Sequence, residues 1–276
     1  MDGDGRYSRN ELLFGAEGQK RIGEARVGVV GLGGLGSHVG QQLSYLGVLD
    51  YVLVDNDIVT GSSLNRLVGA VGGDVGVPKV VVAERVIMGV QPAATVLPVE
   101  LGLPGPAALD ALSDRTHIFG CLDREAPRLQ LTDLSSERGI TYIDAATDVE
   151  PDGEYGGRIV VADGRSCLFC LGLIDQEELR REQMTSEQRR AHDATYGISQ
   201  DALEGTGPSV VSLNGAVASL AINEFMVGVT GMGDPARHLI HRARSRRLTR
   251  STDVPSPACP YCGRWQAATP SDDATE

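Results

Sequence analysis

The sequence predicts an α/β fold, a doubly wound and mostly parallel sheet of the Rossmann-like type, with a C-terminal part tied on by zinc. Short runs rich in branched apolar residues alternate with stretches of helical length through residues 26–144, which is the pattern of repeated β-α-β units. A glycine-rich turn from Gly31 to Gly36 follows the first run, as in folds that bind a phosphate group beside the sheet. Two distant Cys-x-x-Cys pairs predict the zinc-tied part.

The predicted strands are short, rich in β-branched residues and bounded by turn residues. They lie at Arg26–Val30, Tyr51–Val54, Thr95–Val99, Thr116–Gly120 and Ile140–Asp144, with a further strand at Gly156–Val161. The predicted helices lie at Gly34–Leu46, Pro78–Met88, Ala107–Leu112 and Glu125–Arg138, with a longer apolar one at Val210–Val229. Pro78 suits the first turn of its helix, because the N–H that proline lacks is not needed there.

The chain divides into a polar N-terminal arm, one large domain and a short tail. Residues 1–25 form the arm, and residues 26–265 form the domain, whose length allows a sizeable core. Within the domain, residues 175–202 are charged and weakly apolar, so we expect a helix-and-loop excursion inside a crossover segment at residues 171–208. Residues 266–276 are small and polar, and we expect them to be disordered.

Composition is typical of a soluble globular protein with an acidic surface. Hydrophobic residues make up 41% of the sequence, and without an apolar run of about 18 residues no membrane span is expected. The acidic start, Met1 to Gly5, lacks the apolar core of a signal peptide, which by default indicates a cytoplasmic location.

The net charge of −12 argues against a general nucleic-acid binder and suits a partner with a basic face. Arg237–Arg250 is a local exception with six arginines, for which a solvated pair of strands or turns is favoured over a binding patch.

The five cysteines divide into two pairs and a single residue, Cys121. In a cytosolic chain, paired Cys-x-x-Cys spacing indicates a metal before a disulfide. A redox dithiol would show one such pair, whereas Cys167, Cys170, Cys259 and Cys262 form two. These four thiols are therefore the predicted ligands of one structural Zn²⁺.

The glycine loop and the strand after it predict a nucleotide site. Gly31, Gly33, Gly34 and Gly36 would let the backbone approach a phosphate, and Asp55, which closes the next strand, would take the ribose hydroxyls. An NAD-dependent oxidoreductase would show the same features, so they do not by themselves identify the nucleotide.

Three charged residues favour ATP over NAD. Arg66 comes shortly after Asp55 and Asp57, and Lys79 begins a helix, where its ammonium joins the positive helix end. Asp123 follows the fourth strand, at the edge where such sheets bind ligands. Two cations for a polyphosphate and a carboxylate for Mg²⁺ are what ATP needs, and NAD needs neither.

With these motifs together, the chain resembles the ThiF/MoeB/HesA family of ubiquitin-activating-type adenylyltransferases. The resemblance runs from about Arg6 to Cys262 and rests on motifs that occur in family order. They are Arg6-Tyr7-Ser8-Arg9, the Gly31–Gly36 loop, Asp55, Leu64-Asn65-Arg66, Pro78-Lys79, Cys121-Leu122-Asp123 and both Cys-x-x-Cys pairs.

The resemblance implies a role for each matching residue. Asp55 resembles the carboxylate that holds the ATP ribose, and Arg66 and Lys79 resemble the cations on the phosphates. Asp123 resembles the Mg²⁺ ligand needed for adenylation. Arg9 resembles an arginine that family members insert into the ATP site of a second subunit, which implies a homodimer. The implied nucleotide-binding set is Gly31, Gly33, Gly34, Gly36, Asp55, Asp57, Asn65, Arg66, Lys79 and Asp123.

The implied reaction is attack of a substrate carboxylate on the α-phosphate of ATP, giving an acyl adenylate and pyrophosphate. A carboxylate is ionised at neutral pH, so the step needs no general base and depends on positioning and on cations. The implied substrate is the C-terminal glycine of a small ubiquitin-like or sulfur-carrier protein that ends in Gly-Gly.

The sequence departs from the family pattern at several positions. Ser63 and Arg124 stand where the family commonly has asparagine, and Arg124 is open to a phosphate or substrate contact or to a salt bridge alone. Relatives that form a thioester or persulfide place a cysteine in the crossover segment, whereas residues 171–208 contain none. Cys121 lies at a strand end, which suggests a packed wall residue. The sequence therefore predicts adenylation without a covalent enzyme thioester.

Other functions stay open beside the leading one. The substrate could instead be a short peptide or a small acid of a biosynthetic pathway, or the protein could be a tRNA-acting dehydratase, against which the overall acidity argues. An NAD-dependent oxidoreductase is disfavoured by Arg66, Lys79 and Asp123, and a partner-binding pseudoenzyme by the presence of these three residues together with Asp55. The leading hypothesis is activation of a carrier protein.

Overall fold

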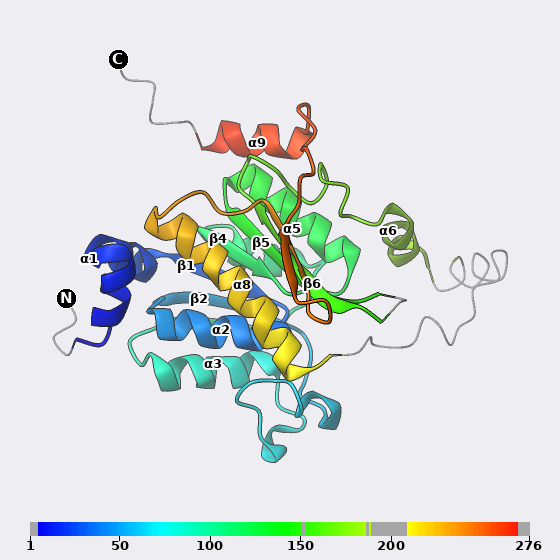
Figure 1. Ribbon diagram of the computed structural model, residues 1–276. Helices are drawn as coiled ribbons and strands as arrows, with labels where there is room; N and C mark the ends of the chain where they lie inside the picture. Colours follow the sequence, from blue (N-terminus) through cyan, green and yellow to red (C-terminus); the bar gives the residue numbers. More distant parts are fainter. Residues whose placement is uncertain (1–4, 151–152, 186–187, 189–208, 270–276) are drawn as a thin grey trace.

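The computed structural model describes residues 5–150, 153–185, 188 and 209–269. Its strands form one eight-stranded sheet in the order β3-β2-β1-β4-β5-β6-β7-β8 (Figure 1). The strands are β1 (Arg26–Val30), β2 (Asp50–Val54), β3 (Thr95–Val99), β4 (His117–Gly120), β5 (Thr141–Val149), β6 (Tyr155–Ala162), β7 (His238–Arg242) and β8 (Arg247–Arg250). The α-helices are α1 (Ser8–Glu24), α2 (Gly34–Leu46), α3 (Lys79–Val90), α4 (Pro106–Leu112), α5 (Glu125–Arg138), α6 (Gln176–Gln183), α8 (Val211–Thr230) and α9 (Pro260–Ala268).

The sheet is parallel in its first half and antiparallel in its second. β3, β2, β1, β4 and β5 pair in parallel, so their carboxyl ends meet at one edge. β5, β6, β7 and β8 pair antiparallel. The chain builds outward from β1 to β3 and then crosses back to β4 on the other side of β1. Sheets of this kind bind ligands at that switch point. The predicted doubly wound, mostly parallel fold class is confirmed.

Two hydrophobic layers cover the two faces of the sheet, because successive strand residues point to opposite faces. Val27 and Val29 of β1 pack in one layer with residues of α1, α2, α3 and α8. Val52, Val54 and Ile118 pack in the other layer with residues of α4 and α5. The central strands are apolar on both faces for this reason, as buried parallel strands are.

The long apolar helix that the sequence predicts is α8, which crosses the sheet beside α2 (Figure 1). The sequence predicted no apolar run long enough to span a membrane. Among the helices that the structure describes, α8 is the one with the length and hydropathy of a membrane-spanning helix. It contacts α1, α2, β5 and β6 and buries Leu213, Val217 and Phe225. A Cβ at Gly215 would lie 3.2 Å from Cε1 of His38 on α2, so the glycine permits the close approach. α8 is therefore a core helix of this fold.

The structure corrects several predicted boundaries. Much of the N-terminal arm is helical, as α1 with a break at Gly15, whose φ is 73°. Pro78 is the N-cap of α3 and not a first-turn residue. β5 continues beyond Asp144 to Val149, because its extension pairs with β6. α9 extends into the expected tail as far as Ala268. The rest of the tail, residues 270–276, and residues 186–187 and 189–208 of the crossover segment lie outside the described residues.

The arginine-rich stretch Arg237–Arg250 forms β7, a turn and β8 at the edge of the sheet. All residues of β8 are exposed. Arg242 forms ion pairs with Asp148 and Glu150, each at 3.0 Å. The stretch is thus the strand pair that the sequence favoured, with β8 solvated, whereas β7 pairs with β6 and buries His238 and Leu239.

A buried group of charged residues lies between α5 and the sheet. Asp144 of β5 is fully buried, and one of its oxygens lies 3.3 Å from Nε of Arg128. The Tyr142 hydroxyl donates to the same oxygen at 2.9 Å. Arg128 also donates to Glu125 at 3.0 Å. Burial lowers the pKa of Arg128, but the neighbouring anions, Asp144 first, raise it by more, so the pKa lies above its usual value. Arg128 and Asp144 therefore depend on each other for charge compensation.

We expect Asp144→Asn to lower the free energy of unfolding by about 3 kcal/mol, because removing the carboxylate of a buried ion pair is strongly destabilising and leaves Arg128 with Glu125 alone as its anionic partner among the described residues. Guanidinium unfolding followed by circular dichroism measures this change. The control is Glu24→Gln, which breaks the exposed Lys20–Glu24 pair at 3.8 Å and should change stability by less than about 1 kcal/mol. Equal stability of the two variants would contradict the expectation.

Candidate nucleotide and metal sites

The glycine loop joins β1 to α2 and makes two close backbone contacts. Gly31 has a φ of 84°, and a Cβ there would lie 2.5 Å from the carbonyl oxygen of Cys121. A Cβ at Gly36 would lie 1.9 Å from the carbonyl oxygen of Gly31. These positions require glycine for steric reasons. The loop after β1 consequently lies directly against the loop after β4, at the switch point of the sheet.

The remaining loop glycines lie where α2 begins. Gly33 is the N-cap of α2, and a Cβ there would meet nothing within 4 Å. The first amides of a helix are unpaired donors and attract anions. A Cβ at Gly34 would lie 2.2 Å from Nδ2 of Asn214 and 3.2 Å from Cδ of Arg66. The helix start is therefore open at Gly33 and bordered by Asn214 and Arg66 at Gly34.

Asp55 follows β2 at the same edge of the sheet. Its carboxylate accepts hydrogen bonds from the backbone N–H of Leu32, at 2.6 Å, and of Asp57, at 2.7 Å. Burial raises the pKa of Asp55, while the Lys79 ammonium and the two amide hydrogen bonds act in the opposite direction. Asp55 thus holds the glycine loop in place and keeps further lone pairs for a hydroxyl donor.

The two predicted cations lie at the same edge. Nζ of Lys79, at the start of α3, lies 2.7 Å from a carboxylate oxygen of Asp57, and the Lys79 N–H donates to the Asp57 carbonyl at 2.9 Å. Arg66 donates to the carbonyl of Ser62 and to Oδ1 of Asn65, the latter at 3.2 Å. The structure therefore brings Asp55, Asp57, Arg66 and Lys79 around the glycine loop.

Asp123 and Cys121 lie in the loop after β4. Asp123 is exposed, whereas Cys121 packs against the core and its N–H donates to the Val30 carbonyl at 2.8 Å. Burial, and secondly the charge of Asp144, holds the pKa of the Cys121 thiol well above its usual value. Nη2 of Arg124 lies 3.7 Å from Glu182. The sequence left open whether Arg124 contacts a phosphate or substrate or forms only a salt bridge, and the structure contains the salt bridge.

Arg9 lies away from these residues within its own chain. It is exposed near the start of α1, and a Cβ at Gly47 would lie 2.8 Å from the ring of its neighbour Tyr7. Gly47 follows the C-terminus of α2, whose 13 residues begin at the glycine loop. A helix of that length spans about 20 Å. The structure does not bring Arg9 to the nucleotide residues of the same chain.

Sequence reasoning missed two residues that border the site. Asn214 is 1% exposed, contacts the glycine loop and donates to Oγ of Ser209 at 3.0 Å. A polar residue near the start of an apolar helix was the available signal. The other residue, Glu182 of α6, meets the first amides of α5. No local pattern points to that contact, because it joins positions 56 and 57 residues apart.

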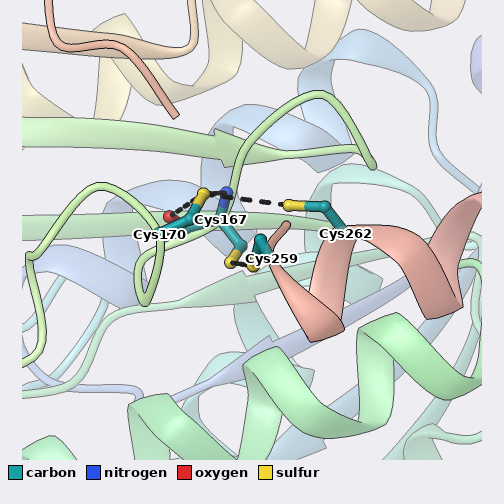
Figure 2. A group of neighbouring side chains, drawn as sticks. All are labelled: Cys167, Cys170, Cys259 and Cys262. Carbon is teal, nitrogen blue, oxygen red and sulfur yellow. Dashed lines mark hydrogen bonds between the residues drawn. The ribbon is translucent and has the colours of Figure 1, made fainter. Parts of the chain in front are cut away.

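The four paired cysteines meet although the two pairs are far apart in sequence (Figure 2). Their sulfur atoms all lie within 4.8 Å of one another. Sγ of Cys167 lies 3.6 Å from Sγ of Cys259, and Sγ of Cys170 lies 3.8 Å from Sγ of Cys262. A sulfur tetrahedron around Zn²⁺ at about 2.3 Å has edges of about 3.8 Å. The cluster has the ligand set and the dimensions of a metal site.

The cysteine cluster lies where α9 docks on the body of the domain. Cys259 precedes α9 and Cys262 is in its first turn, while the other pair follows β6. Nε1 of Trp265 donates to the Ile140 carbonyl at 3.1 Å, and Arg264 forms an ion pair with Asp133 of α5 at 2.6 Å. The C-terminal part is therefore attached through the cysteines and through α5 together.

A family model and curated relatives match this chain over long ranges. The ThiF family model matches residues 7–262. Molybdopterin-synthase adenylyltransferase of Salmonella typhimurium is 37% identical over 264 residues, which cover 94% of this chain and 96% of that protein. SAMP-activating enzyme E1 of Haloferax volcanii is 34% identical over 158 residues, 54% of this chain and 58% of that protein.

Solved structures match the fold. A crystal structure of Escherichia coli MccB with MccA-N7isoASN superposes with a TM-score of 0.76 at 18% identity, covering 95% of this chain and 75% of that one. A crystal structure of PaaA superposes with a TM-score of 0.70 at 20% identity, covering 91% of this chain and 84% of that one. At this identity the likeness concerns the fold alone, whereas the family match extends from the arm to the last cysteine. The chain belongs to the ThiF family.

Proposed function

We propose that the protein is an ATP-dependent adenylyltransferase that activates the C-terminal carboxylate of a small ubiquitin-like or sulfur-carrier protein as an acyl adenylate. The observation that carries the proposal is the convergence of an open helix start, two cations and an exposed carboxylate at one switch point. Lys79 and Arg66 border the glycine loop, and Asp123 lies in the loop that touches Gly31. This set suits a polyphosphate with a divalent cation.

Each residue receives a role from its place in the site. The first amides of α2 bind phosphate oxygens, and Asp55 binds the ribose hydroxyls. Lys79 and Arg66 neutralise the phosphates, Lys79 turning from Asp57 toward them. Asp123 is the Mg²⁺ ligand, and its exposed carboxylate fits a hard cation that prefers oxygen. Bound Mg²⁺ supplies charge neutralisation on the departing pyrophosphate.

The chemistry requires positioning more than acid–base catalysis. The substrate carboxylate oxygen attacks the α-phosphorus of ATP, the bond to the bridging oxygen breaks, and pyrophosphate leaves with the electron pair. The attacking carboxylate is already ionised, so these residues need only align it and stabilise the charge that develops. A site built from Arg66, Lys79 and Asp123 meets that need.

The substrate class is proposed from the relatives' names. The Salmonella relative is named for molybdopterin synthase, and a Thermus thermophilus relative, 28% identical over 94% of this chain and 90% of that protein, is a sulfur carrier protein adenylyltransferase. A peptide substrate is the second candidate, because the MccB structure contains MccA-N7isoASN. It rests on a likeness of fold. We favour the carrier protein because it rests on sequence identity over nearly the whole chain.

We propose that the protein works as a homodimer in the cytoplasm. On α1 before the break at Gly15, Leu12 is 88% exposed and Leu13 is 59% exposed. Large apolar side chains exposed next to one another favour burial against a partner. Arg9 lies about one turn before them and does not reach its own nucleotide site. A second copy covering this part of α1 would let Arg9 enter the partner's site.

We expect Asp123→Ala to abolish ATP–pyrophosphate exchange with a carrier protein ending in Gly-Gly, because the variant lacks the Mg²⁺ ligand. The fold should persist, since the exposed Asp123 side chain contributes little packing. Asp110→Ala, at an exposed aspartate of α4, is the control and should exchange at the wild-type rate. Unchanged exchange in Asp123→Ala would contradict the assignment, and an absence of exchange in the wild type would contradict the function.

We expect about one Zn²⁺ per chain, held by Cys167, Cys170, Cys259 and Cys262 at about 2.3 Å as a closed and therefore structural site. Elemental analysis and X-ray absorption at the zinc edge measure its amount and geometry. Cys259→Ser should lose the metal and lower the melting temperature, because α9 would be tied less firmly. Cys121→Ser, the matched control, should keep the metal. Free thiols in a metal-free native protein would refute the site.

We expect no covalent enzyme–carrier thioester. Residues 171–208 contain no cysteine, and burial keeps the Cys121 thiol protonated, so no reactive thiolate is available. Incubation with ATP and the carrier should yield a carrier–AMP species by mass spectrometry and no conjugate that an added thiol cleaves. Cys121→Ser should retain exchange, at most weakened by altered packing. A thiol-sensitive conjugate that disappears in Cys121→Ser would identify Cys121 as a nucleophile.

A further inference from the structure

Helix α5 begins directly after the loop that contains Asp123, and its own sequence does not cap it. Its N-cap residue is Arg124, which forms no side-chain cap and has no acceptor atom to form one. By contrast, α6 is capped locally by Asp175, which accepts from the N–H groups of Glu177 and Glu178. The first amides of α5 therefore need an acceptor from elsewhere.

Glu182 of α6 is that acceptor. Its two carboxylate oxygens accept from the N–H groups of Glu125 and Ala126, each at 2.9 Å. Its side chain is 8% exposed, and Nη2 of Arg124 lies 3.7 Å away. Two amide donors, a guanidinium and the positive end of the helix all face this carboxylate, which accounts for a nearly buried charge at this point.

The contact anchors the Asp123 loop on one side, and the sheet anchors it on the other. Before Asp123, the Cys121 N–H donates to the Val30 carbonyl at 2.8 Å, and Gly31 packs against the Cys121 carbonyl. After Asp123, Glu182 holds the first two residues of α5. Residues 122–124 lie between these two anchors. The direction of the exposed Asp123 carboxylate thus depends on a residue of the crossover segment.

We propose that Glu182 is a positioning residue for adenylation, which orients Asp123 toward the divalent cation by capping α5. The proposal rests on the proposed function. It explains why arginine at position 124 is compatible with the site, since Arg124 lies beside the carboxylate that caps its own helix. It also couples the crossover segment to the cation site without contact between Glu182 and the nucleotide.

The test compares Glu182→Ala and Glu182→Gln with Glu178→Ala. Glutamine keeps the length and one acceptor oxygen but places an amide NH₂ toward the other backbone N–H, so its effect should be intermediate. Glu178, on the same helix, forms an ion pair with Arg181 at 3.0 Å, in which the Glu178 side chain is 48% exposed, and among the described residues its carboxylate forms no hydrogen bond or ion pair with α5. It controls for loss of one negative charge from α6.

Pyrophosphate exchange measured over a range of Mg²⁺ concentrations is the functional readout. Glu182→Ala should slow exchange about tenfold to a hundredfold, as expected for a catalytic group displaced by about 1 Å, and should raise the Mg²⁺ concentration for half-maximal rate severalfold. The KM for ATP should change less than the Mg²⁺ requirement. Glu182→Gln should fall between Glu182→Ala and wild type, and Glu178→Ala should match wild type.

Hydrogen exchange at the amides of Glu125 and Ala126 tests the contact without activity. Their protection should fall in Glu182→Ala, while protection in β1 and β4 stays unchanged. Wild-type Mg²⁺ dependence in a folded Glu182→Ala variant would overturn the proposal, as would unchanged amide protection. If Glu182→Ala does not fold, the same measurements on Glu182→Gln decide. If the wild type itself shows no pyrophosphate exchange, the proposed function fails. The hydrogen-exchange protection of the Glu125 and Ala126 amides still tests whether Glu182 caps α5.

Discussion

The contact between Gly31 and the carbonyl of Cys121 is the constraint on which the site depends. It occurs where the chain, having built β1, β2 and β3, returns to place β4 on the other side of β1. At that switch point the loops after β1 and β4 touch, because Gly31 has no side chain and adopts a φ of 84°. The loop after β1 leads into the N-terminus of α2, which is open at Gly33, and the loop after β4 contains Asp123. A residue larger than glycine at position 31 would force them apart and would separate the proposed phosphate and cation sites.

The elements that local sequence predicted well are those with strong local signals. The predicted bounds of β1, β3, α2 and α5 match the structure residue for residue. β1 is a short apolar run buried in the core, and β3 is a short run rich in β-branched residues at the edge of the sheet. The two helices end at Gly47 and Gly139, which take the left-handed conformation that favours glycine. α1 was not predicted as a helix, since its sequence is polar and its stability comes from contacts with α8 and the end of α2. The extension of β5 likewise depends on its partner, β6.

The residues of the candidate site likewise divide into those that local sequence predicted and those that it did not. Residues in recurring local motifs were predicted, and the structure gathers Asp55, Asp57, Arg66 and Lys79 around one loop. Glu182 and Asn214 were not predicted, because each acts through a contact with a residue far away in sequence. Glu182 lies on α6 inside the crossover segment, and Asn214 lies at the start of α8 just after it. Cys167 and Cys170 of the cysteine cluster precede the same segment. The connection from β6 to α8 is therefore held at several points that only the fold reveals.

Charge acts on two length scales in this protein. The net charge of −12 would repel ATP if it acted as a uniform field, yet salt screens exposed charges beyond about 8 Å at physiological ionic strength. Around the glycine loop, the helix start, Lys79 and Arg66 oppose Asp55 and Asp57. The Asp57 side chain is 62% exposed, so a polyphosphate can replace its contact with Lys79. Nucleotide recognition is then a local matter of donors and cations. The acidic remainder of the surface is left to govern encounters with macromolecules, which favours a carrier with a basic face over a nucleic acid.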